Sequence, residues 1–169
     1  MINLYKTEIR KDASECKLYI TRKFAAPLDM VWRAWTEPEL LDQWWAPRPY
    51  QTRTKSMDFS EGGCWLYSMN GPEGDAHWCR ADYITIVNND HYTAKDAFCD
   101  EDGLINEAHP RMLWKNRFES DGDQTRVVVE VTFNNVEEIE KIIEMGFKEG
   151  FTAAHDNLDE LLTALEQKD

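Results

Sequence analysis

Few side chains in this sequence could carry acid–base chemistry, and His155 is the first candidate. It follows Phe151 by four residues and precedes Leu158 by three, so on a helix it would border the apolar stripe. An imidazole beside a pocket could take up or release a proton near neutral pH. Tyr67 is the second candidate, as a partner for His155 in the same pocket. The alternative interpretation is that His155 is a structural residue at the edge of the core.

A larger group of residues has the types that bind a ligand rather than react with it. On the predicted strands 62–70 and 110–120, alternation places aromatic and methionine side chains on the face that turns toward the core. Close packing alone would favour Leu, Ile and Val, whereas large rings and flexible thioethers with a few polar tips are typical of a small-molecule pocket. The sequence therefore predicts a site for a small hydrophobic ligand, with a plain packed core as the alternative. The predicted ligand-binding residues are Trp65, Tyr67, Met69, Trp78, Met112, Trp114, Asn116, Phe118, Phe151 and His155.

Motifs of metal and cofactor sites are missing from the sequence. The four cysteines, Cys16, Cys64, Cys79 and Cys99, form no CxxC, and the four histidines show no HxxxH or HExxH spacing. There is also no nucleophile elbow, phosphate loop or dinucleotide fingerprint. We therefore expect no metal and no cofactor. The cysteines fall within predicted strands, where each would act as a small hydrophobic residue.

The formal net charge of −13 argues against partners that carry phosphate backbones or anionic lipids. No apolar run approaches the ~18 residues that cross a bilayer, and the N-terminus lacks the apolar core of a signal peptide. We therefore expect a cytoplasmic protein that binds neither nucleic acid nor membranes. The sequence leaves its oligomeric state open.

Hydrophobic periodicity indicates the elements that must position these side chains. Residues 16–24 alternate as a half-buried strand, and two short helices follow. Pro27 is expected to begin the first helix, while Thr36 and Glu39 are expected to cap the second. Six strands joined by tight turns then predict an antiparallel meander. Their approximate ranges are 50–59, 62–70, 76–88, 91–99, 110–120 and 124–134.

The last part of the chain is predicted to be helical. A short helix over 136–145, with Asn135 as its cap, ends at Gly146, and a longer helix covers about 148–167. Twenty residues of helix are ~30 Å long, which is enough to cross a sheet. The acidic segment 100–109 is predicted to be a mobile loop between two strands.

Three local orientations depend on the register of these elements. Trp44 is expected to pack inward, with Trp45 either at the mouth of the pocket or on the following proline loop. Arg80 and Asp82, which share one face with Trp78, are expected to form a surface pair. Glu130 is expected to face outward, because its neighbours along the strand are apolar valines. A shift of one residue would turn Glu130 inward and make it the leading catalytic acid.

Three segments of the sequence are similar to a known superfamily. They are ITRKFAAPLDMVWRAWTEPELLDQWWAP at 20–47, GGCWLYSMNGPEG at 62–74 and GFKEGFTAAHDNLDELLTAL at 146–165. With the order of elements, they resemble the SRPBCC superfamily, also called START-like or helix-grip, over about residues 16–166. The branch that they resemble is related to the activator of the heat-shock protein 90 ATPase.

The resemblance implies an α+β fold in which one domain spans residues 1–169. Its curved antiparallel sheet would have seven strands, two short helices after the first strand, and a long C-terminal helix packed over the concave face. Members of the superfamily enclose or transform hydrophobic small molecules in a cavity between sheet and helix.

The first functional hypothesis is therefore a ligand-binding protein, and the second is a cyclase or hydrolase that uses the same cavity. The third is an interaction protein with a chaperone partner, for which Trp45 and the proline loop are the candidate surface.

Overall fold

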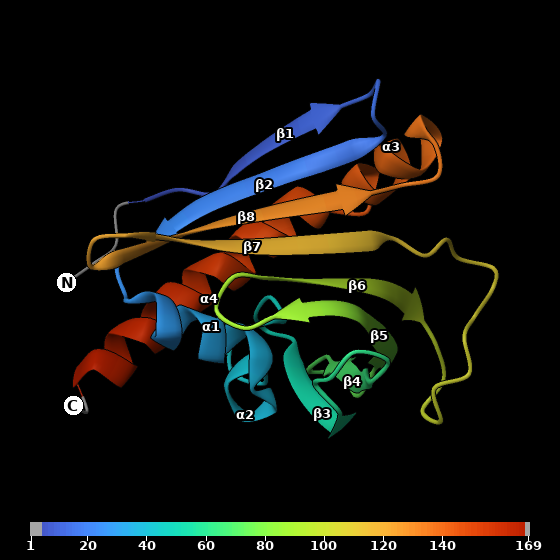
Figure 1. The fold of residues 1–169 in the computed structure, drawn as a ribbon. Coiled ribbons are helices and arrows are strands. Elements are labelled where there is room, and N and C mark those ends of the chain that lie inside the picture. The colour runs from blue at the N-terminus through green and yellow to red at the C-terminus, as the bar shows by residue number, and fades with distance from the viewer. Residues whose placement is uncertain (1–4, 168–169) are drawn as a thin grey trace.

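One antiparallel sheet is the largest element of the computed structural model, which describes residues 5–167 (Figure 1). Residues 1–4 and 168–169 of the predicted domain lie outside the described residues. The sheet has the strand order β1-β2-β8-β7-β6-β5-β4-β3. Its strands are β1 (Glu8–Asp12), β2 (Lys17–Phe24), β3 (Gln51–Met57), β4 (Cys64–Asn70), β5 (Ala76–Val87), β6 (His91–Phe98), β7 (Leu113–Asp121) and β8 (Gln124–Thr132).

Within residues 5–167 the sheet has eight strands, so the prediction of seven was wrong by one. The additional strand is β1, which forms an antiparallel hairpin with β2, opposite Ile9 to Ile20. Its sequence, EIRKD, contains one apolar side chain, so no alternation marks it as a strand. Cys16 is also not in a strand as predicted, because it occupies the turn of this hairpin with φ 56°.

Four helices complete the described part of the chain: α1 (Leu28–Thr36), α2 (Pro38–Leu41), α3 (Val136–Glu144) and α4 (Phe147–Gln167). The predicted cap of α3 is present, because the Asn135 side chain accepts the Glu138 N–H at 2.9 Å. The predicted cap of α2 is wrong. Thr36 is the last residue of α1 and donates its hydroxyl to the Trp32 carbonyl at 2.8 Å, so Glu37 is the residue that precedes α2.

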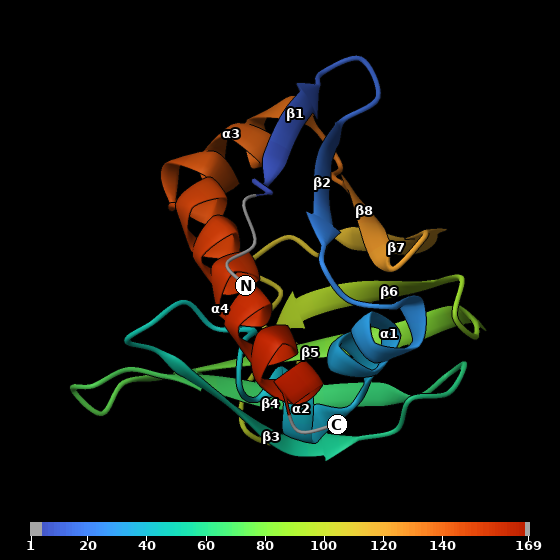
Figure 2. The same cartoon turned by 90° about the vertical axis from the view of Figure 1, so that its left-hand side faces the viewer.

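The sheet bends around α4, and α1 lies on the same concave side (Figure 2). The inward residues of β2 and β8, such as Ile20 and Val129, have no exposed surface. The buried residues of α4 that face them include Ala154 and Leu158, on the stripe predicted from the sequence. Glu130 lies opposite Tyr19 and Lys115 on the outer face, as predicted. No helix in residues 5–167 is both long and apolar enough to cross a bilayer.

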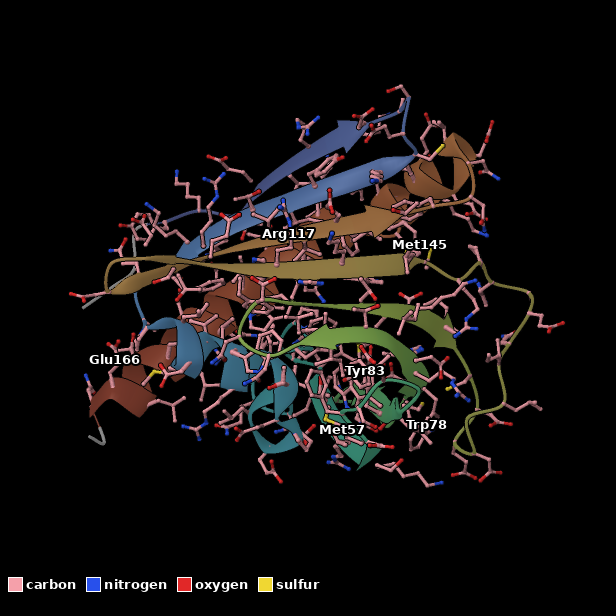
Figure 3. All side chains as sticks on the ribbon, viewed as in Figure 1. Met57, Trp78, Tyr83, Arg117, Met145 and Glu166 are labelled. Atoms are coloured by element: carbon pink, nitrogen blue, oxygen red, sulfur yellow. The ribbon has the colours of Figure 1, made fainter. Side chains whose placement is uncertain are left out.

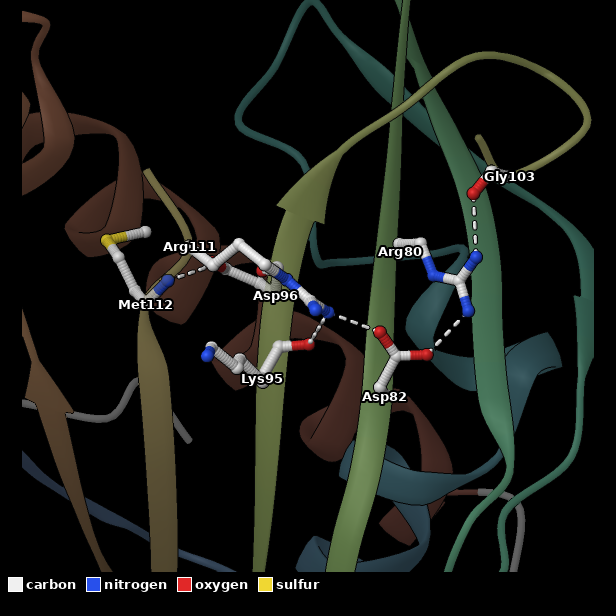
Figure 4. Close-up of polar contacts among 7 residues, drawn as sticks. All are labelled: Arg80, Asp82, Lys95, Asp96, Gly103, Arg111 and Met112. Atoms are coloured by element: carbon white, nitrogen blue, oxygen red, sulfur yellow. Dashed lines mark hydrogen bonds and ion pairs between the residues drawn. The ribbon is translucent and has the colours of Figure 1, made fainter. Parts of the chain in front are cut away.

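The acidic segment between β6 and β7 packs on the outer face of the sheet. The Arg80 guanidinium donates to the Gly103 carbonyl at 2.6 Å and to Asp82 at 2.6 Å (Figure 4). Asp82 also accepts a hydrogen bond from Arg111, so the predicted surface pair is part of a larger network. Lys55 donates to the Glu101 carbonyl at 2.7 Å. The segment that we expected to be a mobile loop is therefore attached to the sheet by several hydrogen bonds.

Candidate functional site

A cleft of about 310 Å³ lies between one end of the sheet and the junction of α3 with α4. β4, β5, β6 and the chain around the start of β7 form one wall. The end of α3 and the first two turns of α4 form the other. Met145, at the end of α3, is 61% exposed and lies near the start of β7 (Figure 3). The large apolar side chains of the lining are Trp45, Met69, Phe98, Met112, Trp114, Ile142, Met145, Phe147 and Phe151.

Trp45 forms the inner wall of this cleft. The chain leaves α2 in a tight turn, in which the Trp44 and Trp45 N–H groups both donate to the Leu41 carbonyl. Both rings point inward as a result, although they are adjacent in sequence. The buried Trp44 indole donates to the Ala34 carbonyl at 2.9 Å, and the half-buried Trp45 indole donates to the Tyr67 hydroxyl at 3.1 Å. Trp45 therefore contributes to the cleft rather than to an exposed surface.

The two polar groups of β4 and β5 that reach the cleft are neutral near pH 7. The Tyr67 ring stacks on Trp65 with 3.9 Å between centroids, and burial raises the pKa of the Tyr67 hydroxyl well above its usual value. Burial likewise raises the pKa of the Cys79 thiol to about 12. Neither group supplies a charge to the site.

Asp96 on β6 is the charged side chain of the cleft, and the sequence reasoning missed it. One carboxylate oxygen accepts the Met112 N–H at 2.8 Å, and the other accepts the Trp114 indole N–H at 2.8 Å. Burial raises the pKa of Asp96 to about 6, and these two hydrogen bonds oppose the rise. A signal was present in the sequence, because Asp96 takes the inward position between Ala94 and Phe98 in an alternating strand.

Most of the predicted ligand-binding residues do come together around Asp96. Tyr67, Met69, Met112, Trp114 and Phe151 line the cleft itself. A smaller adjoining hollow, of about 60 Å³, has Asp96 in its wall as well. Its other lining residues include the predicted Trp65, Tyr67, Trp114 and Asn116.

Trp78 and Phe118 are not brought to the cleft. The register pairs Trp78 with Ser68 and places Trp78 on the outer face, where the Lys55 ammonium lies 5.9 Å from its ring centroid. Phe118 does face inward, but it packs under α1, with 5.0 Å between its ring centroid and that of Trp32. The alternation of the strand predicted which face Phe118 would occupy, but not which helix would cover it.

His155 is buried in the core and does not line the cleft, so it does not meet Tyr67 there. Its Nδ1 lies 2.9 Å from the Thr7 hydroxyl, and its ring centroid lies 4.3 Å from that of Phe151. Burial, with the Arg22 guanidinium as the second cause, lowers the pKa of His155 to about 3. The imidazole is therefore neutral near pH 7. Across residues 5–167, no three His, Cys, Asp or Glu side chains are grouped so that they could hold a metal ion.

Comparison with known proteins found one matching family model, described as Activator of Hsp90 ATPase homolog 1-like protein, over residues 25–163. A solution structure from Arthrobacter aurescens is 29% identical with a TM-score of 0.87, and the match covers 93% of this chain and 91% of that one. A crystal structure from Mycobacterium smegmatis is 28% identical with a TM-score of 0.86, covering 94% and 98%. The search of curated proteins found no match. With more than half of its length matched, the chain belongs to the Activator of Hsp90 ATPase homolog 1-like family, the branch of the SRPBCC superfamily that its sequence resembles.

Proposed function

We propose that this protein binds a small, largely apolar molecule in the cleft at the α3–α4 junction. The observation that carries the proposal is the cleft of about 310 Å³ with mostly aromatic and methionine walls. Its volume lies at the lower end of the ~300–1,000 Å³ that is usual for small-molecule sites. The four free thiols, in Cys16, Cys64, Cys79 and Cys99, support the expected cytoplasmic location.

Rigid and adaptable side chains are combined in the lining. The Trp45 and Trp114 indoles are each fixed by a hydrogen bond, to Tyr67 and Asp96 respectively. Met69 and Met112 have several rotatable bonds and can adjust to a ligand's outline. This combination suits an aromatic or branched molecule better than a long chain.

A variant that fills the cleft tests the proposal. Gly150 on α4 lines the cleft, and a Cβ atom there would meet only the Pro47 ring, at 3.8 Å. We expect Gly150→Leu to fold and to lose ligand binding because its side chain occupies the ligand's space. Gly150→Ala is the matched control, since it adds the Cβ alone and should retain binding.

The measurement is a thermal-shift screen of small aromatic and aliphatic compounds. A ligand at about 100 times its dissociation constant should stabilise the wild type by ~2.7 kcal/mol. The same shift in Gly150→Ala and none in Gly150→Leu would support the site. A full shift in Gly150→Leu would place the ligand elsewhere, and a screen without any shift would contradict the proposed function.

An enzyme of the cyclase or hydrolase type is a second candidate, and Asp96 is the observation that favours it. A carboxyl group with a pKa of about 6 can exchange a proton near neutral pH. If the protein is an enzyme, a ligand from the screen should be converted to product in amounts that exceed the protein. Asp96→Asn should then abolish conversion, and recovery of unchanged ligand would leave binding as the function.

A chaperone partner is the third candidate, supported by the description of the matching family. Trp45 cannot provide the exposed surface that we expected for it, because the ring is directed into the cleft. Stimulation of a purified Hsp90-type ATPase would support this function. Unchanged ATPase rates, with no cross-linked complex, would count against it.

A further inference from the structure

Asp96 places a negative charge in the lining of the main cleft, whose other described residues are apolar or neutral. Its carboxylate belongs to the lining of the main cleft and also of the two smaller hollows that adjoin it. Among residues 5–167, no ion pair includes Asp96. The nearby Arg111 guanidinium donates to the Asp96 backbone carbonyl and to Asp82, not to the Asp96 carboxylate (Figure 4). Arg111 lowers the pKa of Asp96 through its nearby charge, but within residues 5–167 no cationic side chain forms an ion pair with the carboxylate.

The carboxylate also has unused capacity to accept hydrogen bonds. Each of its oxygens accepts one donor, from Met112 and from Trp114. An ionised carboxylate offers about four acceptor positions, so about two remain open. Asp96 is half-buried rather than fully enclosed, so part of its surface stays accessible. A donor that entered the cleft could reach it.

The aromatic walls favour a cation as that donor. The ring centroids of Trp45 and Trp114 lie 6.1 Å apart, and each lies within 6 Å of the Phe151 ring centroid. The negative faces of such rings attract an ammonium group within about 6 Å, with Trp the strongest. The net charge of −13 also raises the local concentration of cations around the protein.

We propose that the molecule bound in the cleft is an organic amine in its ammonium form, with Asp96 as its counterion and its apolar part against the wall that the Trp45, Trp114 and Phe151 rings form. This inference rests on the proposed binding function and adds the chemical class of the ligand. A neutral ligand of the same shape would satisfy the walls but would leave the Asp96 charge without a partner.

The test compares three probes that share an indole ring and differ in charge. They are tryptamine, 2-(indol-3-yl)ethanol and indole-3-propionate, each titrated calorimetrically at pH 7.5. We expect wild-type protein to bind the amine at least ~10-fold more tightly than the alcohol, with the acid weakest, because each charge-assisted contact strengthens binding. Asp96→Asn should remove the preference for the amine. Glu119→Gln, which removes an exposed carboxylate on β7, controls for the change in net charge.

Asp96→Asn turns one acceptor oxygen into a donor and can weaken the fold, so a second measurement uses the wild type alone. Between pH 7.5 and 5.0 Asp96 takes up a proton, and the affinity for tryptamine should fall about tenfold while that for the alcohol stays constant. Other titratable or charged groups surround Asp96 in the cleft and the two hollows, and the Arg111 guanidinium acts on it from nearby. Those in the walls are Tyr67, Cys79, Tyr83, Tyr92, His109, Glu138 and Lys141. Because histidines ordinarily titrate in this range, the series is repeated in His109→Gln.

Equal binding of the amine and the alcohol would overturn the inference and leave the proposed function standing. So would an affinity for the amine that does not change down to pH 5.0. If none of the three probes binds and the thermal-shift screen is also empty, both the inference and the proposed function fail.

Discussion

His155 shows how burial changes what a residue can do. The sequence placed it at the edge of an apolar stripe, which suits a catalytic or a structural histidine equally. In the structure its ring is enclosed by Phe24, Trp35 and Phe151, and its Nε2 atom has no hydrogen-bond partner. A proton added there would be a buried charge without a counterion, which is why the pKa falls.

This burial makes the stability of the protein depend on pH. The pKa of His155 is about 3 when folded and ~6.5 when unfolded, so between these values only the unfolded chain binds the proton. The stabilisation that the neutral His155 gives to the folded state is therefore complete above pH ~6.5 and is lost as the pH falls toward 3. From pH 7 to pH 5 the free energy of unfolding, measured with urea, should fall by about 2 kcal/mol more in the wild type than in His155→Gln. Parallel losses in the two proteins would mean that the folded imidazole is protonated.

The sequence did not identify Asp96 as a site residue, and the reason is physical. Aromatic and histidine residues stand out as candidate site residues in a sequence, whereas a single aspartate among many acids does not. Asp96 is an ordinary acid in HYTAKDAF, and although alternation directs it inward, opposite Ala81, alternation alone does not show that a site forms around it. The donors that hold it, Met112 and Trp114, come from the other end of a long connection. No sequence pattern predicts that the chain after this connection comes back beside Asp96.

At the scale of elements, the α3–α4 junction is the part that sets the width of the cleft. Gly146 has φ 93°, which a residue with a Cβ adopts at a cost, and it redirects the chain between the two helices. Gly150 lies inside α4, where glycine is a poor helix former. The two glycines of this one junction therefore have opposite effects on stability.

Alanine substitutions at these glycines should shift the melting temperature in opposite directions. Gly146→Ala should lower the free energy of unfolding by about 1 kcal/mol through backbone strain. Gly150→Ala should raise it by about 0.5–1 kcal/mol through helix propensity. Thermal denaturation followed at 222 nm measures both. A stabilised Gly146→Ala would show that the junction relaxes out of the left-handed conformation.

The sequence predicted most elements because their hydrophobic periods are strong. Seven strands, the long last helix and the inward faces of β4, β7 and β8 follow from alternation and from the 3.6-residue stripe. β1 was missed because backbone pairing with β2 holds it in place. Ile9 is its one apolar contact with the core, so the sequence shows no alternation there. The position of α1 over Phe118 was not predictable either, since periodicity does not say which helix covers which part of a sheet.

At the scale of the whole molecule, one core joins β2, near the start of the chain, to α4, near its end. Leu18 and Ile20 on β2, Trp35 on α1 and Leu158 on α4 belong to the same buried cluster, which also contains Trp65 on β4. We therefore propose that the chain is a single domain and expect it to unfold in one step. The transitions in urea followed by near-ultraviolet and far-ultraviolet circular dichroism should coincide. A separate early transition of either signal would indicate a subdomain.

The arrangement of the indoles has a practical consequence for finding the ligand. Trp45 and Trp114 lie side by side in the lining of the cleft with 6.1 Å between ring centroids, while Trp78 lies on the opposite face of the sheet. Of the seven tryptophans, an occupant of the cleft would change the surroundings of these first two, while distant rings such as Trp78 would contribute a constant background. The intrinsic tryptophan fluorescence of the unlabelled protein should therefore report occupancy directly. The wavelength of its emission maximum and its intensity should change as ligand is added, without any attached dye.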